Sequence, residues 1–312
     1  MALGTNHLSN QATSVQEFIP ELWSDDIIAS YKQNLVLANL VSKINHKGKK
    51  GDTIHIPKPT RGSANSKVVG SPVTLNENNS SELTVVLDKH YEYSFVIEDI
   101  IAIQALDSLR RFQTDDAGYA LASQVDDDLW TLAAALQGGT SYSAAVIGGD
   151  GVTVWDGSAN TNTGNGTTLT DAGIREMSQL LDDANVPMQG RVLVIPPVEK
   201  NTLLGLARFT EQAFVGEVGA GNSIRNGKIG DIYGMEVYVS TNCPTVAADD
   251  TTTNYRVGMM FHKDAFVLAE QMGVRTQSTY VQEYLGDLFT SDMIYGIAEL
   301  RDDAGVAFFV PQ

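Results

Sequence analysis

A long helical pattern of apolar positions occupies the middle of the chain. Residues 98–137 contain no proline and a single glycine, Gly118, and their apolar side chains form one stripe at helical spacing. The stripe consists of Leu109, Phe112, Ala117, Leu121, Val125, Leu129, Leu132 and Leu136. We predict a long helix over 107–137, while residues 98–106 could form a separate short helix. A wholly helical run would reach on the order of 60 Å, which suits a strut across a subunit better than the core of a small enzyme.

The segment before this helix has a strand pattern and a basic composition. Residues 53–57 are typical of a strand, residues 83–87 of its return strand, and Gly, Ser, Asn and Pro are frequent in the tip between them. Residues 43–72 carry one acid, Asp52, against the basic residues Lys43, Lys47, Lys49, Lys50, Lys58, Arg61 and Lys67. An isolated hairpin is marginal in water, and this one has too few apolar residues to bury itself. We interpret it as an arm that docks on another surface, with a solvated hairpin as the alternative.

The other elements predict a mixed α+β chain. Residues up to about 14 are typical of a flexible arm, and apolar positions between 19 and 40 are spaced for one or two short amphipathic helices. Residues 138–168 indicate a loop with a short hairpin around 152–155. From Thr170, which can cap a helix over 170–184, the pattern is α/β. We expect a strand over 191–195, a helix over 198–208, a mobile glycine-rich loop over 216–230, and strands over 236–240, 258–261, 265–268, 273–281, 293–300 and 306–310.

The overall charge narrows the possible partners. The formal net charge is −17 at pH 7, so the surface repels nucleic acid and anionic membranes, and generic DNA binding is not expected. Such a surface suits a wall that encloses DNA without adhering to it. The single cysteine, Cys243, excludes an internal disulfide framework and is expected to be a buried small hydrophobe. No secretory signal or bilayer-spanning segment is expected, so we place the protein in a cytoplasm or in something assembled there.

The candidate catalytic and cofactor motifs in the sequence are incomplete. Gly219 and Gly221 begin a dinucleotide fingerprint that lacks its third glycine and its leading strand. The five histidines are dispersed, and residues 156–162 match a calcium loop too poorly to count as one. The run 126–128 of three aspartates points in three directions around a helix, which we interpret as a solvated face. We therefore expect no catalytic residue, no cofactor and no metal.

Four blocks carry a resemblance to a known family. Residues 227–244 (GKIGDIYGMEVYVSTNCP) resemble the turn-and-strand block of tailed-phage major capsid proteins with the Hong Kong 97 fold. Residues 261–269 and 292–306 resemble the following segment and the closing strand pair of that family, and residues 88–130 are similar as well. The resemblance covers the chain in order.

The resemblance implies an α+β fold with five regions. They are an N-terminal arm with short helices (1–46), an extended hairpin loop (47–87), a peripheral domain with a long spine helix (88–169), an axial α/β domain (170–256), and C-terminal strands (257–312) that complete both domains.

The resemblance also implies a function. It is that of a major capsid protein that assembles into hexamers and pentamers of an icosahedral shell around double-stranded DNA, performs no turnover and resides in the virion. A separate scaffolding protein is expected, because the N-terminal arm is short, together with a portal and a possible decoration protein. One alternative is an encapsulin-like compartment shell around an enzyme cargo; another is a cytoplasmic α/β enzyme.

Intersubunit contact residues follow from the charge pattern. A loop that cannot support itself is accounted for if it lies across a neighbouring subunit. We expect its basic residues to face acidic positions of the neighbour's helix. The basic set is Lys47, Lys49, Lys50, Lys58 and Arg61, and the acidic set is Asp115, Asp116, Asp126 and Asp127.

Overall fold

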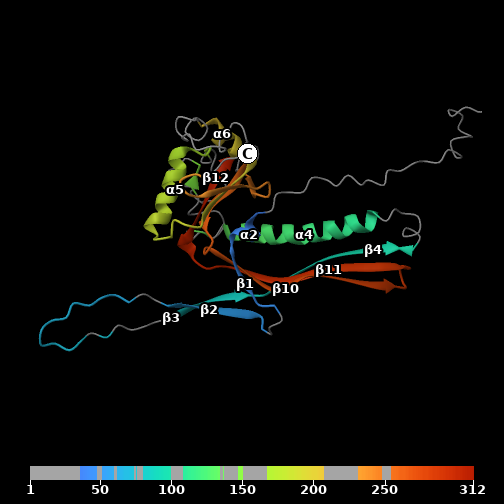
Figure 1. Ribbon diagram of the computed structural model, residues 1–312, viewed down its shortest axis with the longest axis horizontal. Helices are drawn as coiled ribbons and strands as arrows, with labels where there is room; N and C mark the ends of the chain where they lie inside the picture. Colours follow the sequence, from blue (N-terminus) through green and yellow to red (C-terminus); the bar gives the residue numbers. More distant parts are fainter. Residues whose placement is uncertain are drawn as a thin grey trace, which may run out of the picture.

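The structure is a computed structural model. It describes residues 36–47, 51–59, 62–73, 75, 80–99, 108–133, 136, 147–149, 167–206, 231–247 and 254–312. In these ranges the chain forms a long sheet, a compact sheet and a separate hairpin (Figure 1). The long sheet has the order β1 (Ser42–Asn45), β10 (Phe266–Val281), β11 (Gly286–Glu299) and β4 (Lys89–Glu98). The compact sheet has the order β5 (Ile147–Gly148), β12 (Gly305–Pro311), β9 (Asn254–His262), β6 (Arg191–Ile195) and β7 (Glu236–Val239), with β8 (Thr245–Ala247) paired to β9.

Helix α4 (Ser108–Ala133) lies along one face of the long sheet (Figure 1). Its 26 residues span about 39 Å, which confirms a long helix, although it begins at Ser108 and ends at Ala133, inside the predicted range 107–137. Strand β4 continues to Glu98, and its side chains alternate between half-buried and exposed. The half-buried side chains face α4, since the hydroxyl of one of them, Tyr93, donates to Gln113 of α4 at 3.4 Å. The short helix α2 (Leu37–Leu40) packs against α4 as well.

The compact sheet is built around a wholly buried strand. Every residue of β6 is buried, as its continuous apolar run predicts. Helix α5 (Asp171–Asp183) is capped by Thr170, whose hydroxyl accepts a hydrogen bond from the Gly173 amide at 3.0 Å, which confirms the predicted cap. Helix α6 (Pro197–Gly205) follows β6 and has proline at its start. The predicted strands and helices of this region are confirmed.

The tail is more continuous than the sequence pattern indicates. The segments expected at 265–268 and 273–281 form the single 16-residue strand β10. Register shifts between Glu270, Met272 and Arg275 interrupt its alternation, which explains why the pattern predicts two strands. Strand β12 contains the predicted segment 306–310, and β11 contains the predicted segment 293–300 except for Leu300. A short 3₁₀ helix, η2 (Asp302–Ala304), lies between the two strands.

The extended loop has an anchored base and a projecting tip. Strands β2 (Thr53–Pro59) and β3 (Ser80–Val86) pair antiparallel, as predicted. Val85 and Leu87 form a second small core with Val267 and Ala269 on the face of the long sheet opposite α4. This close approach requires glycine at 296, since a Cβ there would lie 2.2 Å from the Val86 carbonyl oxygen. The hairpin base therefore docks on the long sheet of the same subunit, and the tip extends away from the body (Figure 1).

Several predictions lie outside the described residues. They concern the N-terminal arm up to residue 14, the helical pattern between 19 and 35, most of 98–106, the hairpin around 152–155, the candidate calcium loop at 156–162 and the glycine-rich loop 216–230. The predicted contact residues Lys49, Lys50 and Arg61 also lie outside them.

Candidate assembly surfaces and the junction between the sheets

The two predicted basic contact residues that the structure describes lie at the base of the extended loop. The Lys47 ammonium pairs with the Glu270 carboxylate of β10 at 3.1 Å, and both side chains remain partly exposed. Lys58 is exposed on β2, and its charge helps to lower the pKa of Asp303, after the larger effect of the hydrogen bond from Arg301. Lys47 thus has a partner within its own subunit, while Lys58 presents its charge at the surface.

The predicted acidic contact residues differ in exposure along α4. Asp115 is exposed and Asp116 half-buried in the first half of the helix. Asp127 is exposed near its end, where one oxygen accepts a hydrogen bond from the Asn242 amide at 2.6 Å. These three carboxylates lie where a neighbouring molecule could reach them.

The expectation that residues 126–128 form a solvated face is wrong for two of the three aspartates. Asp126 is 0% exposed, and its carboxylate accepts from the Leu37 amide at 2.9 Å and from the Asn242 amide at 3.1 Å. Burial raises its pKa. Asp128 is also buried, and it accepts from the Tyr295 hydroxyl at 2.6 Å. Consecutive helix residues point about 100° apart, so a helix covered on two sides turns two of three inward.

Asp126 is thereby a structural residue, and its removal tests this. Asp126→Ala leaves the buried Leu37 amide without its acceptor, so we expect a loss of about 2–3 kcal/mol in the free energy of unfolding. Asp127→Ala, one residue away and exposed, is the matched control and is expected to change it by less than about 1 kcal/mol. Urea denaturation of both variants measures the difference. Equal effects would contradict the assignment.

The tip of the extended loop exposes apolar side chains. Val69 is 100% exposed, Leu75 86%, Val73 68% and Val68 65%. The Lys67 ammonium is turned back onto the loop, where it donates to the carbonyl oxygens of Val68 and Ser71. Clustered exposed apolar side chains on a projecting loop mark an interaction surface.

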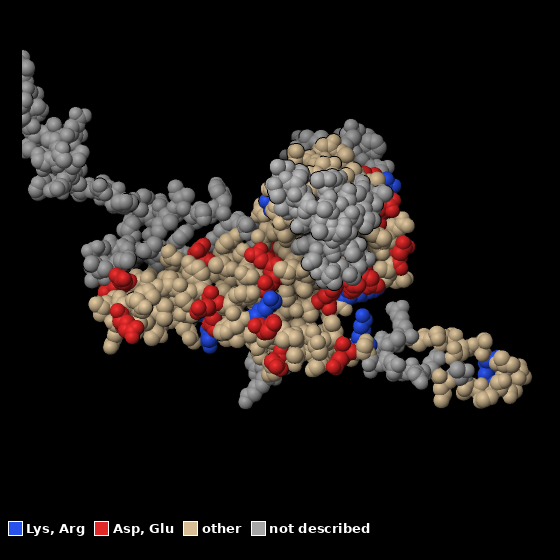
Figure 2. Space-filling view, turned by 180° about the vertical axis from the view of Figure 1, so that it is seen from behind, with Lys and Arg blue, Asp and Glu red and all other residues tan. Residues whose placement is uncertain are grey.

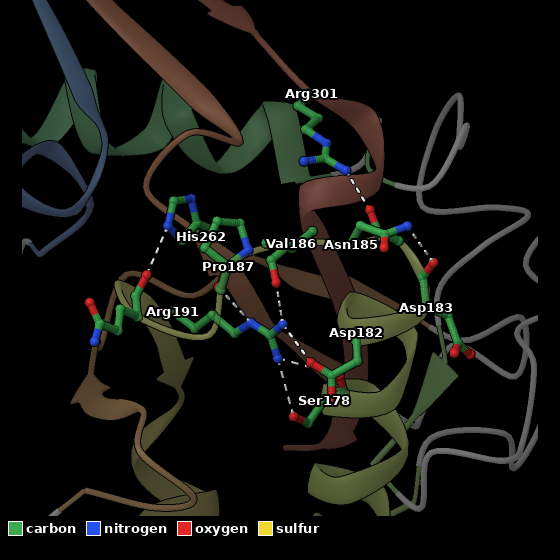
Figure 3. A network of polar contacts seen from close by, with 11 residues as sticks. Ser178, Asp182, Asp183, Asn185, Val186, Pro187, Arg191, His262 and Arg301 are labelled. Atoms are coloured by element: carbon green, nitrogen blue, oxygen red, sulfur yellow. Dashed lines mark hydrogen bonds and ion pairs between the residues drawn. The ribbon is translucent and has the colours of Figure 1, made fainter. Parts of the chain in front are cut away.

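A buried arginine organises the turn between α5 and β6 (Figure 3). The Arg191 side chain is 2% exposed and begins β6. Its guanidinium donates to the carbonyl oxygens of Pro187 at 3.0 Å and Val186 at 2.6 Å. It also pairs with Asp182 of α5 at 2.7 Å. One side chain thus fixes the whole turn between α5 and β6.

The junction between the two sheets consists of residues 263–265 and 300–304, the chain connections β9–β10 and β11–β12. The two connections are bonded to each other, since the Leu300 amide donates to the Ala265 carbonyl at 2.8 Å. Arg301 pairs with Asp303 and donates to the Ala184 carbonyl at the end of α5. The His262 ring donates to the Gln189 carbonyl at 3.0 Å (Figure 3). The junction is therefore held by polar contacts to the compact sheet.

The described residues include no candidate metal site and one buried thiol. They contain no group of three His, Cys, Asp or Glu side chains that could hold a metal ion. Cys243 is buried, and its burial raises the pKa of the thiol to about 12, which makes it unreactive and confirms the expected buried position. A cavity of about 600 Å³ lies between α4 and the long sheet, with walls that include Val125, Leu268 and Met293.

On the face of the molecule that Figure 2 shows, acidic side chains are more frequent than basic ones. In Figure 2, Asp and Glu side chains are spread over the body, and Lys and Arg side chains are sparse. In the described part of the chain, no helix has the length and apolar character needed to cross a membrane.

Comparisons with known proteins give one family from the sequence and one fold from solved structures. Residues 82–308 match the sequence model of a family described as phage capsid protein. No curated protein matches the sequence. Among solved structures, a chain from Mycobacterium phage Che8 has 23% identity and a TM-score of 0.71, with 93% of this chain and 97% of that one covered. The capsid of the cyanophage P-SCSP1u has 17% identity and a TM-score of 0.73, with 97% and 96% covered. The capsid of the cyanophage Pam1 has 13% identity and a TM-score of 0.72, with 99% of both chains covered. The expected Hong Kong 97-like fold is confirmed.

Proposed function

The chain belongs to the phage capsid protein family, and from this premise we propose that it assembles as hexamers and pentamers of an icosahedral shell around double-stranded DNA. The family confirms the expected structural role as a major capsid protein, and it favours neither the compartment shell nor the enzyme. The observation that carries the proposed assembly is the extended loop. Its base is anchored, and the apolar side chains of its tip are exposed.

The loop tip gains a place to bind if it lies over a neighbouring subunit. Removing apolar surface from water is worth about 25 cal/mol per Å², so exposed valines and a leucine supply a driving force for association. A tip on one part of the molecule that binds a different part of the next molecule makes a head-to-tail contact, which closes into a ring when the rotation permits. The proposed pentamers and hexamers are rings of this kind.

Charge pairs supplement this contact. We propose that Lys49, Lys50, Lys58 and Arg61 face Asp115, Asp116 and Asp127 of the neighbour, while Lys47 and Asp126 keep their partners inside the subunit. Exposed pairs contribute roughly 0–1 kcal/mol each, and salt screens them. Their contribution grows with the number of subunits, so raised salt weakens assembly.

The five regions have distinct places in this proposal. Residues 170–256 form the axial domain around the capsomer centre, and residues 88–169 form the peripheral domain with α4 as its spine. The loop 47–87 reaches the neighbour, the arm 1–46 adds contacts, and strands in 257–312 link both domains. A separate scaffolding protein, a portal and a decoration protein are the proposed partners, and assembly takes place in the host cytoplasm. The net charge of −17 keeps the wall from adhering to the enclosed DNA.

The loop tip provides a direct test of the assembly. Val69→Asp places a charge where an apolar contact is proposed, and we expect at least about tenfold fewer closed shells in negative-stain images and light scattering. The free energy of unfolding should change by less than about 0.5 kcal/mol, because Val69 is fully exposed in the subunit.

The matched control is Leu180→Asp on α5, which is 40% exposed and lies outside the loop. It is expected to leave shell yield unchanged. The wild-type chain should be expressed alone and with the product of its neighbouring gene. A stable monomer or dimer under both conditions would contradict the proposed assembly. Normal shells from Val69→Asp would contradict the proposed contact of the loop tip with a neighbouring subunit.

A further inference from the structure

A partly buried carboxyl group lies at the end of the long sheet. Glu299 is the last residue of β11, directly before the connection 300–304. Its Oε1 atom is buried and has no hydrogen-bond partner among the residues that the structure describes. A buried carboxylate without a donor is costly, so the geometry favours the neutral acid at this position.

The charged groups around Glu299 do not compensate a negative charge. The Asp302 carboxylate, on the same connection, lies within hydrogen-bonding reach of the Glu299 carboxyl. The nearest cation on the connection, Arg301, pairs with Asp303, and Lys58 of β2 acts on Asp303 as well. Asp264, on the other connection, faces Arg301, and the His262 ring donates to the Gln189 carbonyl. A proton is therefore the simplest counterion for the two adjacent carboxylates.

We propose that Glu299 is a protonation-controlled latch for the junction between the two sheets. In the neutral state its O–H donates to the Asp302 carboxylate and holds the connection 300–304 against the end of β11. When Glu299 releases its proton to solvent, two carboxylates are adjacent, and their repulsion loosens the connection. The inference concerns the single subunit and does not depend on the geometry of the shell.

The direction of the pH effect follows from the pKa of the group. Burial and the neighbouring Asp302 raise the pKa of Glu299 from 4.5 to about 7. The folded subunit therefore binds the proton more tightly than the unfolded chain. The latch contributes its full stability below pH 4.5, and this contribution is lost as the pH rises through about 7.

The position of the latch gives its opening a structural consequence. Arg301 joins the connection to the end of α5 through the Ala184 carbonyl, so the connection bears on the compact sheet. The charge of Lys58, at the base of the extended loop, helps to lower the pKa of Asp303 on the connection. Loosening of the connection therefore changes the support of both the loop base and the compact sheet.

Hydrogen exchange of the full-length subunit tests the latch. We expect the amides of residues 300–304 to exchange at least about tenfold faster at pH 8.5 than at pH 5.5, after correction for the intrinsic pH dependence of exchange. Glu299→Gln, which stays neutral, should abolish this difference. Glu176→Gln on α5 is the control and should retain it.

A second variant locates the proton. Asp302→Asn removes the neighbouring charge from an exposed position, so the midpoint of the exchange transition should move down by about one pH unit. It keeps the test decisive if Glu299→Gln folds poorly. An unchanged midpoint, or a wild-type subunit whose corrected exchange is independent of pH, would overturn the proposal whether or not shells form.

Discussion

Replacing Gly296 with alanine is expected to abolish shell assembly while leaving the compact sheet folded. The new Cβ would lie 2.2 Å from the Val86 carbonyl oxygen, which is a backbone atom and cannot rotate away. The hairpin base must then leave the long sheet, and the small core of Val85, Leu87, Val267 and Ala269 opens. Overpacking of this kind costs roughly 1–3 kcal/mol. The larger effect is on assembly, because the loop tip loses its direction.

Limited proteolysis, circular dichroism and electron microscopy together measure this result. Proteases should cut residues 47–87 of Gly296→Ala much faster than those of the wild type, with little change in the dichroism spectrum. Gly118→Ala is the control, since a Cβ at that helical position meets nothing within 4 Å. It should assemble normally and gain roughly 0.5–1 kcal/mol in stability. Normal shells from Gly296→Ala would show that docking of the hairpin base is dispensable.

The second large effect is expected at Arg191. Arg191→Met removes a guanidinium that is 2% exposed and leaves the Val186 and Pro187 carbonyls without their donor. Each unsatisfied buried group costs about 1–3 kcal/mol, so we expect a loss of roughly 3–5 kcal/mol in the free energy of unfolding. This is a large part of the stability of a typical domain. The turn between α5 and β6 should become labile in hydrogen exchange.

Arg175→Met is the matched control for this variant. Arg175 lies on α5, is 57% exposed and pairs with Asp171 one turn earlier. Exposed helical pairs contribute about 0.3–0.5 kcal/mol, so its loss should be near the limit of a denaturation measurement. If both variants lowered stability equally, the buried network around Arg191 would not hold the turn.

The elements of the fold could be predicted from the sequence where the local pattern agrees with the burial of the side chains. The apolar run of β6, the cap at Thr170 and the stripe of α4 each have one dominant cause, and the structure has all three. The extended loop could be predicted from a lack of apolar residues, because a hairpin that cannot bury itself requires support from another surface. Strand β10 was predicted as two strands, since its bulges break the period of two at Glu270 and Met272.

The polar interior of the subunit could not be predicted from local pattern. Asp126 is buried because its partners, the Leu37 amide and Asn242, come from segments far away in sequence. The partners of Arg191 and Glu299 are near them in sequence, but the burial of these polar groups depends on how the surrounding elements pack. An acidic residue adjoining an apolar stripe was the available signal, but it does not distinguish a solvated position from a hydrogen-bonded buried one. Among the predicted contact residues, exposure therefore separates Asp115 and Asp127 from Asp126.

The length of β10 and β11 has a mechanical consequence. Their 16 and 14 residues pair over nearly their whole length and run from the junction to the far end of the long sheet, about 50 Å at 3.3 Å per residue. A pull along this direction loads many inter-strand hydrogen bonds at once in shear, whereas a pull across the ribbon would peel them one by one. The subunit is therefore stiffest along its long axis. Tension in a wall built from such subunits is carried best by those whose ribbons lie in the plane of the wall.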